Sequence, residues 1–377
     1  MSKLIIAAIS ARGYAQAAVE NGYEVVTLDI FADADTQRFS KQTFKLKMHE
    51  NAVDKADFKR AFLQIDLEKI DGFLYGSLFD SAPDLLAWVA ERVPLIGNEP
   101  DALNQAKDFS FFKLLDELKI MHPEVRIQAP EMNSDWLVKQ IGGSGGMHIK
   151  PANQAREGGY SWNTYFQKRV AGTPISMLFV ADGKSAKTIG YNRQFISPNA
   201  ELPYRFAGAV SNVELQASIH KAFESAAQRL TSTLSLCGIN SLDAILDGDE
   251  LWVLELNPRL GATFHLYENL LPLHIQSCAG DMTSFSPQSN ISKAQLILYA
   301  DDEMEVPHDF DWPSWAADIP ANEEDASGVK ISIGIPICSV LAEADNIGVK
   351  HANEVQALVL QRADKLREML KLKALND

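Results

Sequence analysis

Short apolar runs alternate with stretches of helical character over the first hundred residues. The run Leu4–Ile9 is typical of a buried parallel strand, and Glu24–Leu28 and Gly72–Tyr75 repeat its pattern. An Ala-rich stretch of helical pattern, Ala15–Glu20, separates the first two runs. The alternation predicts a small doubly wound α/β domain over about residues 1–100.

The pattern changes beyond residue 100. The pattern is helical from Ala102 to Lys119, with an apolar stripe and a helix at Phe109–Lys119, and a β-rich region follows from about 123 to 172. A long helix at about 212–236 precedes a hairpin at Ser241–Asn257, and a last helix is expected at about 352–373. We therefore expect three units, at residues 1–100, 101–290 (with a subdomain at about 123–172) and 291–377.

Composition and net charge mainly exclude classes of protein. The chain has 377 residues, 46% of them hydrophobic, which is enough for sizeable cores. Its net charge of −15 disfavours nucleic acid and anionic membranes as partners, although a local basic pocket for phosphate is compatible with it. Three cysteines form no CxxC pair, and the first apolar run lacks the features of a secretory signal or a membrane span. We expect a cytoplasmic protein.

Ligands suited to a metal gather on the predicted hairpin. A turn centred on Asp249 would place Asp243 directly opposite Glu255, and Asn257 would share their face. Facing carboxylates repel by about 4 kcal/mol at an effective dielectric near 20, whereas a hard divalent cation makes the pairing favourable. A solvated surface hairpin would carry the same acids, but here large apolar residues surround them. We interpret the three as ligands of Mg²⁺, with Mn²⁺ as the other ion.

A glycine-rich segment follows the strand that carries Lys139. It consists of Gly142, Gly143, Ser144, Gly145 and Gly146. Glycines let backbone N–H groups approach anionic oxygens, and a lysine on the preceding strand can add a charge to the same phosphates. The segment matches neither the Walker A loop nor the dinucleotide fingerprint, and a merely structural turn could have the same composition. Lys107, next to a predicted helix, is a further candidate for phosphate binding, although an isolated lysine is usually solvated.

Several segments together resemble the ATP-grasp superfamily in order and spacing. They are Ala106-Lys107-Asp108, Leu137-Val138-Lys139 with its glycine loop, Gln167–Gly172, Asp243 and Glu255-Leu256-Asn257-Pro258-Arg259. The resemblance covers about residues 1–290, and the Glu-x-Asn-Pro-Arg segment is its most specific part. It implies an ATP-grasp fold, in which two α+β subdomains hold ATP, with an N-terminal doubly wound pre-ATP-grasp domain and a small C-terminal extension.

The resemblance also implies roles for single residues. Lys107 and Lys139 would bind ATP phosphates, and the Gly142–Gly146 loop would close over them. The adenine hinge would consist of Gln167, Lys168, Arg169 and Val170. Asp243, Glu255 and Asn257 would hold Mg²⁺, while Arg259 and Lys139 would act catalytically on the transferring phosphate. Pro174 stands where many members have an acid for the ribose, so ribose recognition stays undetermined.

The activity that the resemblance implies is ligation. Most members are carboxylate–amine or carboxylate–thiol ligases, so we expect a carboxylate to attack ATP, giving ADP and an acyl phosphate that an amine then consumes. The tail segments Trp312–Pro320 and Gly334–Cys338 are similar to predicted ATP-grasp carboligases, some tied to methanopterin or methanofuran cofactor synthesis. The alternatives are a small-molecule kinase on the same scaffold and a non-catalytic nucleotide sensor.

Candidate substrate-binding residues lie in two places. Arg193 and Arg205 could grip a substrate carboxylate bidentately, although surface arginines would look the same. Ser10 and Arg12 follow the first strand, and ligands bind at the carboxyl ends of parallel strands. The expected partners are a small-molecule carboxylate and an amine, and a homodimer is compatible with the sequence.

Overall fold

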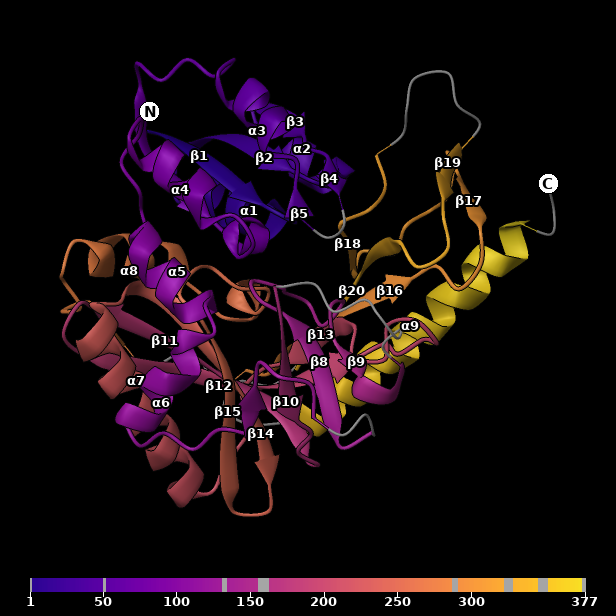
Figure 1. Ribbon diagram of the computed structural model, residues 1–377. Coiled ribbons are helices and arrows are strands. Elements are labelled where there is room, and N and C mark those ends of the chain that lie inside the picture. The colour runs from indigo at the N-terminus through magenta and orange to yellow at the C-terminus, as the bar shows by residue number, and fades with distance from the viewer. Residues whose placement is uncertain are drawn as a thin grey trace.

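A computed structural model describes most of the chain. The described residues are 2–49, 52–130, 134–154, 163–286, 291–321, 328–344 and 352–374. Figure 1 shows an N-terminal α/β layer above a larger central sheet, with a long C-terminal helix at one side. Among the described residues, no helix combines the length and apolarity that crossing a bilayer requires.

The N-terminal unit is a parallel sheet with helices, as the alternating pattern predicts. Its strand order is β3–β2–β1–β6, with every neighbouring pair parallel. The strands are β1 (Lys3–Ala8), β2 (Glu24–Asp29), β3 (Gln42–Lys45) and β6 (Ile70–Tyr75), with a small hairpin of β4 (Met48–His49) and β5 (Ala52–Val53). The helices are α1 (Arg12–Glu20), α2 (Ala34–Arg38), α3 (Lys55–Phe62) and α4 (Pro83–Ala90). α1 therefore begins at Arg12, three residues before the predicted start.

The stretch of helical pattern from Ala102 to Lys119 forms two helices, and the second lies close to the helix expected at Phe109–Lys119. The structure has α5 (Pro100–Lys107) and α6 (Ser110–Glu117), separated by extended backbone at Asp108 (φ −81°, ψ 156°). The Asp108 carboxylate accepts a hydrogen bond from the Ser110 backbone N–H at 2.9 Å, which favours a new helix start over continuation. The break makes Lys107 the last residue of α5, where its side chain reaches the site described below.

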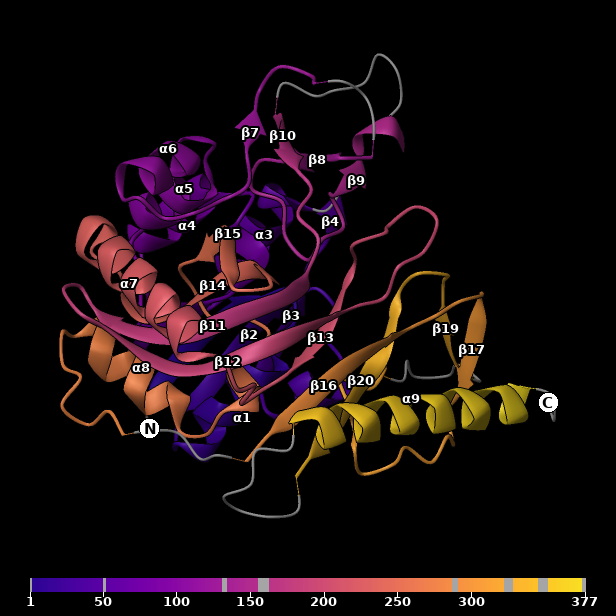
Figure 2. The same ribbon diagram turned by 90° about the horizontal axis from the view of Figure 1, so that it is seen from below.

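A small antiparallel sheet lies within the β-rich region predicted at about 123–172. Its order is β7–β10–β8–β9. The strands are β7 (Val125–Arg126), β8 (Trp136–Gln140), β9 (Lys150–Pro151) and β10 (Thr164–Lys168). Figure 2 shows this sheet standing apart from the long central strands, and it has its own small core around Trp136 and Phe166.

The central sheet runs from the hairpin into the C-terminal part of the chain. Its order is β15–β14–β11–β12–β13–β16–β20–β18. The strands are β11 (Thr173–Asp182), β12 (Ala186–Ile196), β13 (Phe206–Val210), β14 (Cys237–Asp247), β15 (Glu250–Asn257), β16 (Lys293–Tyr299), β18 (Ala316–Ala317) and β20 (Pro336–Glu343), with β17 (Met304–Pro307) and β19 (Gly328–Ile331) paired beside them. Because β13 pairs with β16, the unit boundary proposed at residue 291 falls inside one continuous sheet.

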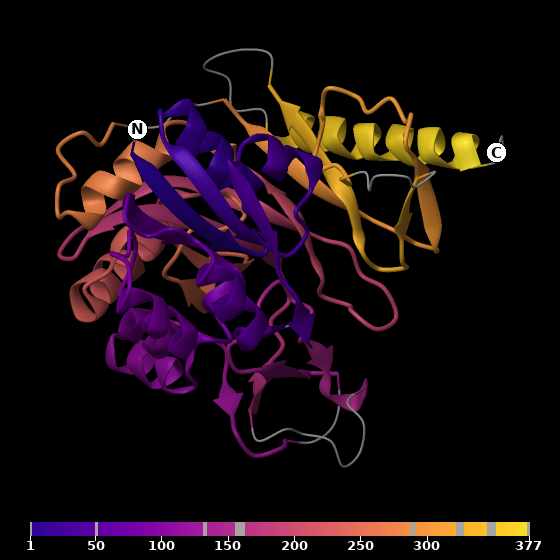
Figure 3. The same ribbon diagram turned by 90° about the horizontal axis from the view of Figure 1, so that it is seen from above.

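Helices cover both faces of the central sheet and connect it to the N-terminal unit. Alternate β11 side chains enter different cores: Phe179 packs with α7 (Ala217–Leu234), and Leu178 packs with α8 (Leu270–Cys278). The α8 core also contains buried residues of β1 and α1, so the N-terminal unit shares a core with the central sheet, as their arrangement in Figure 3 shows. α9 (Ala352–Ala374) packs against β16 and β20.

The β14–β15 hairpin brings the predicted acids together through an irregularity. Asp247 pairs with Glu250, so the turn is Gly248-Asp249 and is not centred on Asp249 as expected. A register shift between Asp243 and Ala244 leaves Leu254 without a partner and restores the pairing of Asp243 with Glu255. The predicted pairing is therefore confirmed, although a β-bulge rather than the turn produces it.

Candidate active site

A cavity of about 1480 Å³ lies where the units meet. We call one part of its lining the charged end, which consists of Lys107, Lys139, Asp243, Glu255, Asn257 and Arg259. We call another part the apolar end, which consists of Ile196, Phe206, Ile297, Tyr299, Ile331, Ile335 and Ile337. Residues of the N-terminal unit, including Ser10 and Arg12, line the cavity as well.

The two acids of the charged end behave as one unit. Asp243 and Glu255 face each other across the hairpin, and Asn257 Nδ2 donates to Asp243 Oδ2 and Glu255 Oε1, each at 3.3 Å. Burial and the neighbouring Glu255 raise the pKa of Asp243 to about 7. Burial alone would raise the pKa of Glu255, but Lys107 and Lys139 outweigh it and hold that pKa below its ordinary value. One carboxylate is therefore firmly ionised while the other competes for a proton.

Two lysines from separate elements complete the charged end. Lys107 Nζ donates to Asn257 Oδ1 at 2.6 Å and lies 3.5 Å from Glu255 Oε2. Burial lowers the pKa of Lys139 on β8 to about 8, although Glu255 and Asp243 act in the opposite direction. The two buried lysines could pair with the phosphates of a polyphosphate, and the two acids could bind a divalent cation. Both ligands could therefore bind in the same site.

The donor set fits a magnesium ion better than a transition metal. Within the described residues, no group of three or more His, Cys, Asp or Glu side chains is placed to hold a metal. The site instead offers two carboxylates, and Mg²⁺ is commonly bound by one or two carboxylates with phosphate oxygens completing its shell. The Asn257 amide turns Nδ2 toward these acids, while its Oδ1 accepts from Lys107 and Arg259. Burial and the facing Glu255 carboxylate raise the pKa of Asp243, and a divalent cation bound between the two acids would favour the ionised form of both.

Asp80 is a functional candidate that sequence reasoning missed. It accepts from Arg259 Nε at 3.1 Å and from Arg259 Nη2 at 2.6 Å, and its Oδ2 lies 3.6 Å from Lys107 Nζ. The side chains of Arg259 and Asp80 are 7% and 1% exposed, so this bidentate pair is buried. Arg259 Nη2 also donates to Asn257 Oδ1 at 2.8 Å. Asp80 thus fixes Arg259 beside the predicted metal ligands from the N-terminal unit.

The glycine loop rests against two other parts of the molecule. A β-carbon at Gly142 would lie 2.8 Å from the Asp80 carbonyl oxygen, and one at Gly146 would overlap the Tyr204 carbonyl oxygen. The Phe206 backbone N–H donates to the Gly145 carbonyl oxygen at 2.9 Å. Gly142, Gly145 and Gly146 all have positive φ, a region that side chains disfavour. The loop lines the cavity with Gly143 and Ser144 and is seated between the N-terminal unit and the β12–β13 connection.

The predicted adenine hinge is not part of the cavity lining. Gln167 is buried in β10, and the backbone N–H groups of Lys168 and Arg169 donate to Glu124 O at 2.8 Å and Asp135 O at 2.7 Å. Those groups are therefore already used inside the small sheet, and Val170 lies outside the lining too. The apolar lining near Lys139 comes instead from Tyr165, Pro174, Ile245 and Leu254.

Arg193 and Arg205 do not line the cavity either. Arg193 Nη2 donates to Asn353 Oδ1 at 2.8 Å, at the start of α9. Arg205 is buried, lies over the Tyr299 ring with its guanidinium carbon 3.7 Å from the ring centroid, and donates to Gly334 O at 3.2 Å. Both guanidinium groups are engaged in contacts within the fold.

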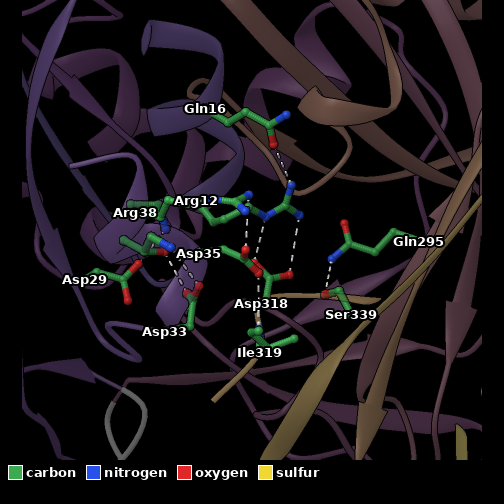
Figure 4. Close-up of polar contacts among 12 residues, drawn as sticks. Arg12, Gln16, Asp29, Asp33, Asp35, Arg38, Gln295, Asp318, Ile319 and Ser339 are labelled. Atoms are coloured by element: carbon green, nitrogen blue, oxygen red, sulfur yellow. Dashed lines mark hydrogen bonds and ion pairs between the residues drawn. The ribbon is translucent and has the colours of Figure 1, made fainter. Parts of the chain in front are cut away.

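Arg12 and Ser10 do line the cavity. Figure 4 shows the polar contacts of Arg12 with its neighbours. Arg12 Nε donates to Asp318 Oδ1 at 2.9 Å and Nη2 to Asp318 Oδ2 at 3.4 Å. Burial would lower the pKa of Arg12, but Asp318 outweighs it and raises that pKa. Nη1 has a long contact of 3.5 Å to Gln16 Oε1, so this edge of the guanidinium is the least engaged.

Comparison with known proteins finds an ATP-grasp domain within this chain. Residues 106–263 match a family model described as an ATP-grasp domain, which confirms the resemblance. This matched segment begins next to Lys107 and includes the glycine loop, both acids and Arg259. Among curated protein sequences, no significant match was found.

Solved structures agree on the fold over most of the chain. The biotin carboxylase domain of Hydrogenobacter thermophilus 2-oxoglutarate carboxylase, crystallised with ADP, magnesium and bicarbonate, has a TM-score of 0.69 at 12% identity, covering 91% of this chain and 86% of its own. N5-carboxyaminoimidazole ribonucleotide synthetase from Thermotoga maritima has a TM-score of 0.66 at 13% identity, covering 97% and 98%. Phosphoribosylglycinamide synthetase from Anaerococcus prevotii has a TM-score of 0.64 at 11% identity, covering 96% and 98%. The chain therefore has the ATP-grasp fold, including its N-terminal and C-terminal units.

Proposed function

We propose that the protein is an ATP-dependent ligase that activates a carboxylate as an acyl phosphate and joins it to an amine. The observation that carries this proposal is the charged end, where Lys107 and Lys139 converge on Asp243, Glu255 and Asn257 in one cavity. The names of the structural neighbours support the class, because they include two synthetases and a carboxylase, the latter crystallised with ADP and magnesium.

The reaction would proceed in two displacements. A carboxylate oxygen of the substrate attacks the γ-phosphorus of ATP and ADP departs, which leaves an acyl phosphate. The amine then attacks the acyl carbon and phosphate departs with the bond electrons. Two steps are required because a free carboxylate is a poor electrophile, and the protein's part is positioning and charge neutralisation.

The residues of the charged end would divide that work. Lys107 and Lys139 would offset phosphate charge, and Asp80 would keep the Arg259 guanidinium oriented toward the same site. Mg²⁺, held by Asp243 and Glu255 and by Asn257 after its amide has turned Oδ1 toward them, would neutralise phosphate oxygens. The glycine loop would keep water from the acyl phosphate, which hydrolyses readily. The apolar lining at Tyr165 and Ile245 would accept the nucleotide base in place of the predicted hinge.

The test is release of ADP from Mg-ATP across a panel of carboxylates and amines, with and without hydroxylamine. A hydroxamate product means that an acyl phosphate forms, as we expect. A stable phosphorylated product with no hydroxamate would indicate the kinase alternative, and ATP binding without turnover would indicate a sensor. Including precursors of methanopterin-type and methanofuran-type cofactors in the panel tests the predicted role in cofactor biosynthesis.

A further inference from the structure

The apolar end is built by strands that follow the matched ATP-grasp segment, together with the β12–β13 connection. Phe206 opens β13, Ile297 and Tyr299 belong to β16, and Ile331 and Ile337 belong to β19 and β20. Ile196 ends β12 and Ile335 lies in the turn before β20. The cavity wall on this side therefore depends on the C-terminal unit.

Large apolar side chains are left uncovered on this wall. Ile196 is 51% exposed and Ile335 is 48% exposed, and both line the cavity. Single exposed apolar residues on a convex surface are ordinary, whereas several that line one concave site indicate contact with an apolar ligand. The exposed apolar side chains are therefore grouped in the cavity and are not scattered over the protein surface.

The wall is held rigid by polar contacts behind it. Arg205 lies over the Tyr299 ring and donates to Gly334 O at 3.2 Å and to Ser197 O at 3.1 Å. The Tyr299 hydroxyl donates to the Phe206 carbonyl oxygen at 2.8 Å. Gly334 adopts a φ of +80°, which lets the turn before β20 fold back within reach of Arg205. A preformed apolar wall of this kind loses little conformational freedom when a ligand binds.

The cavity also has more room than one nucleotide needs. Its volume of about 1480 Å³ exceeds the range of about 300–1,000 Å³ that is usual for a single drug-sized ligand. The charged end accounts for the nucleotide and the reacting groups, so the apolar end is left for another part of the bound substrates.

We propose that the apolar end binds an aromatic or extended apolar substituent carried by one of the two substrates. The protein would then select aryl or long alkyl carboxylates or amines over small polar ones. This inference rests on the proposed function only in assigning the ligand as a substrate, because the apolar site itself is defined by Ile196, Ile335 and their neighbours.

The first experiment measures apolar binding without turnover. The probe is N-phenyl-1-naphthylamine, a neutral aromatic dye, titrated fluorimetrically into the full chain. The test variant is Ile196→Asn/Ile335→Asn, and the control is Ile333→Asn, whose side chain is 63% exposed in the same turn but does not line the cavity. We expect saturable binding, a Kd raised at least about tenfold in the double variant, and a change within about twofold in the control.

The second experiment asks whether the bound ligand is a substrate. ADP release is compared for 3-phenylpropionate and propionate with ethylamine as the amine, and for phenethylamine and ethylamine with propionate as the carboxylate. We expect the KM of the aryl member of at least one pair to be about tenfold lower or more, and the double variant to narrow that ratio while Ile333→Asn leaves it intact. Thermal unfolding of each variant checks that it folds, and Ile335→Ala replaces the double variant if that one does not.

The outcomes separate the two proposals. Absence of saturable dye binding, or equal weakening by Ile333→Asn and Ile196→Asn/Ile335→Asn, overturns the apolar site. A wild-type dimer that the double variant dissociates in sedimentation would also overturn it, because the surface would then be an interface between two copies. Dye binding with no ADP release from any pair keeps the apolar site and refutes the ligase activity instead.

Discussion

The two ends of the cavity are built by different physical means. At the charged end, individual atoms matter, because Lys107, Asn257 and Arg259 are joined by hydrogen bonds of 2.6 and 2.8 Å in a buried network. At the apolar end, contact area matters, because the side chains of Ile196 and Ile335 have no polar atom that could form a hydrogen bond. A buried network fails when one member is removed, whereas an apolar wall tolerates a change of similar volume. We therefore expect substitutions to act steeply at one end and gradually at the other.

The arginines of two arginine–aspartate pairs line different parts of the cavity. Arg259 is held by Asp80 of the N-terminal unit, and both side chains are almost fully buried. Arg12 is held by Asp318 of the C-terminal unit, and Asp318 lies in the left-handed backbone region with a φ of +55°. Each pair links separate parts of the chain across the cavity. The Arg259 pair adjoins the predicted metal ligands, while the Arg12 pair lines the cavity between the N-terminal and C-terminal units.

The largest effect is expected for Glu255→Gln. The substitution keeps the shape of the side chain but removes the ionised member of the acid pair, so Mg-ATP would lose its main counter-charge. We expect ADP formation to fall by about 10²–10³ while the unfolding midpoint changes little. Glu250→Gln, at the exposed start of the same strand, is the matched control and should retain full activity. Unchanged turnover in Glu255→Gln would remove the residue from the chemistry.

Asp80→Asn should have the next largest effect. The amide keeps the size of the side chain but cannot neutralise Arg259, so a buried guanidinium loses its counter-charge. We expect kcat to fall about 10–100-fold with a smaller change in the KM for ATP, and stability to fall by about 3 kcal/mol. Denaturant titration and steady-state kinetics measure the two effects.

The control for Asp80→Asn is Asp84→Asn. Asp84 forms an exposed ion pair with Lys55 at 2.7 Å, and removing an exposed pair costs about 1 kcal/mol or less. If Asp80→Asn lowers stability but leaves kcat and its pH profile unchanged, Asp80 is structural and does not position Arg259 for the reaction.

A pair of glycine substitutions tests how the loop is seated. Gly145 and Gly146 have φ of +66° and +71°, so alanine strains both backbones similarly. A β-carbon at Gly145 meets nothing within 4 Å, whereas one at Gly146 would overlap the Tyr204 carbonyl oxygen. We expect Gly146→Ala to lower turnover about tenfold further than Gly145→Ala and to raise ADP release in the absence of a carboxylate. Equal effects would show that the contact with Tyr204 has no part in closing the site.

Sequence reasoning located the charged end because its residues lie in short, chemically distinctive segments. The pairing of Asp243 with Glu255 follows from alternation along a hairpin, and it survives although the turn is one position away from the one expected. The α/β pattern of the N-terminal unit is equally local, since each strand is a continuous apolar run. Predictions of this kind succeed where one stretch of chain contains the whole signal.

Contacts between distant segments could not be predicted in the same way. Asp80 follows an ordinary apolar strand, and nothing in its neighbourhood indicates that it meets Arg259, which lies 179 positions further along the chain. Arg205 looks like a ligand-binding arginine because it lies in a polar stretch, yet its partners Tyr299 and Gly334 belong to the C-terminal unit. The hinge prediction depended on free backbone groups at Lys168 and Arg169, and the small sheet uses those groups.

The smallest effect is expected for the dependence of the free energy of unfolding on pH. It involves histidines outside the charged end and the apolar end of the cavity. His274 Nδ1 accepts from the Ile239 backbone N–H at 2.9 Å, and Nε2 donates to Ile96 O at 3.0 Å, so the neutral ring fits both contacts.

Burial lowers the pKa of His274 to about 4, and burial lowers that of His148 to about 4 as well. A histidine whose pKa is lower in the folded state than the ordinary value of about 6.5 stabilises the fold above that value. This stability is lost as pH falls from about 6.5 toward 4, because the unfolded chain takes up the proton first. Each such histidine should lower the free energy of unfolding by up to about 1.4 kcal/mol per pH unit in this range, whereas Asp29 and Asp243, whose pKa burial raises to about 7, contribute in the opposite direction. His274→Asn should remove one histidine's share of that slope in urea titrations at pH 7.0 and 5.0, and an unchanged slope would show that His274 does not stay neutral in the fold.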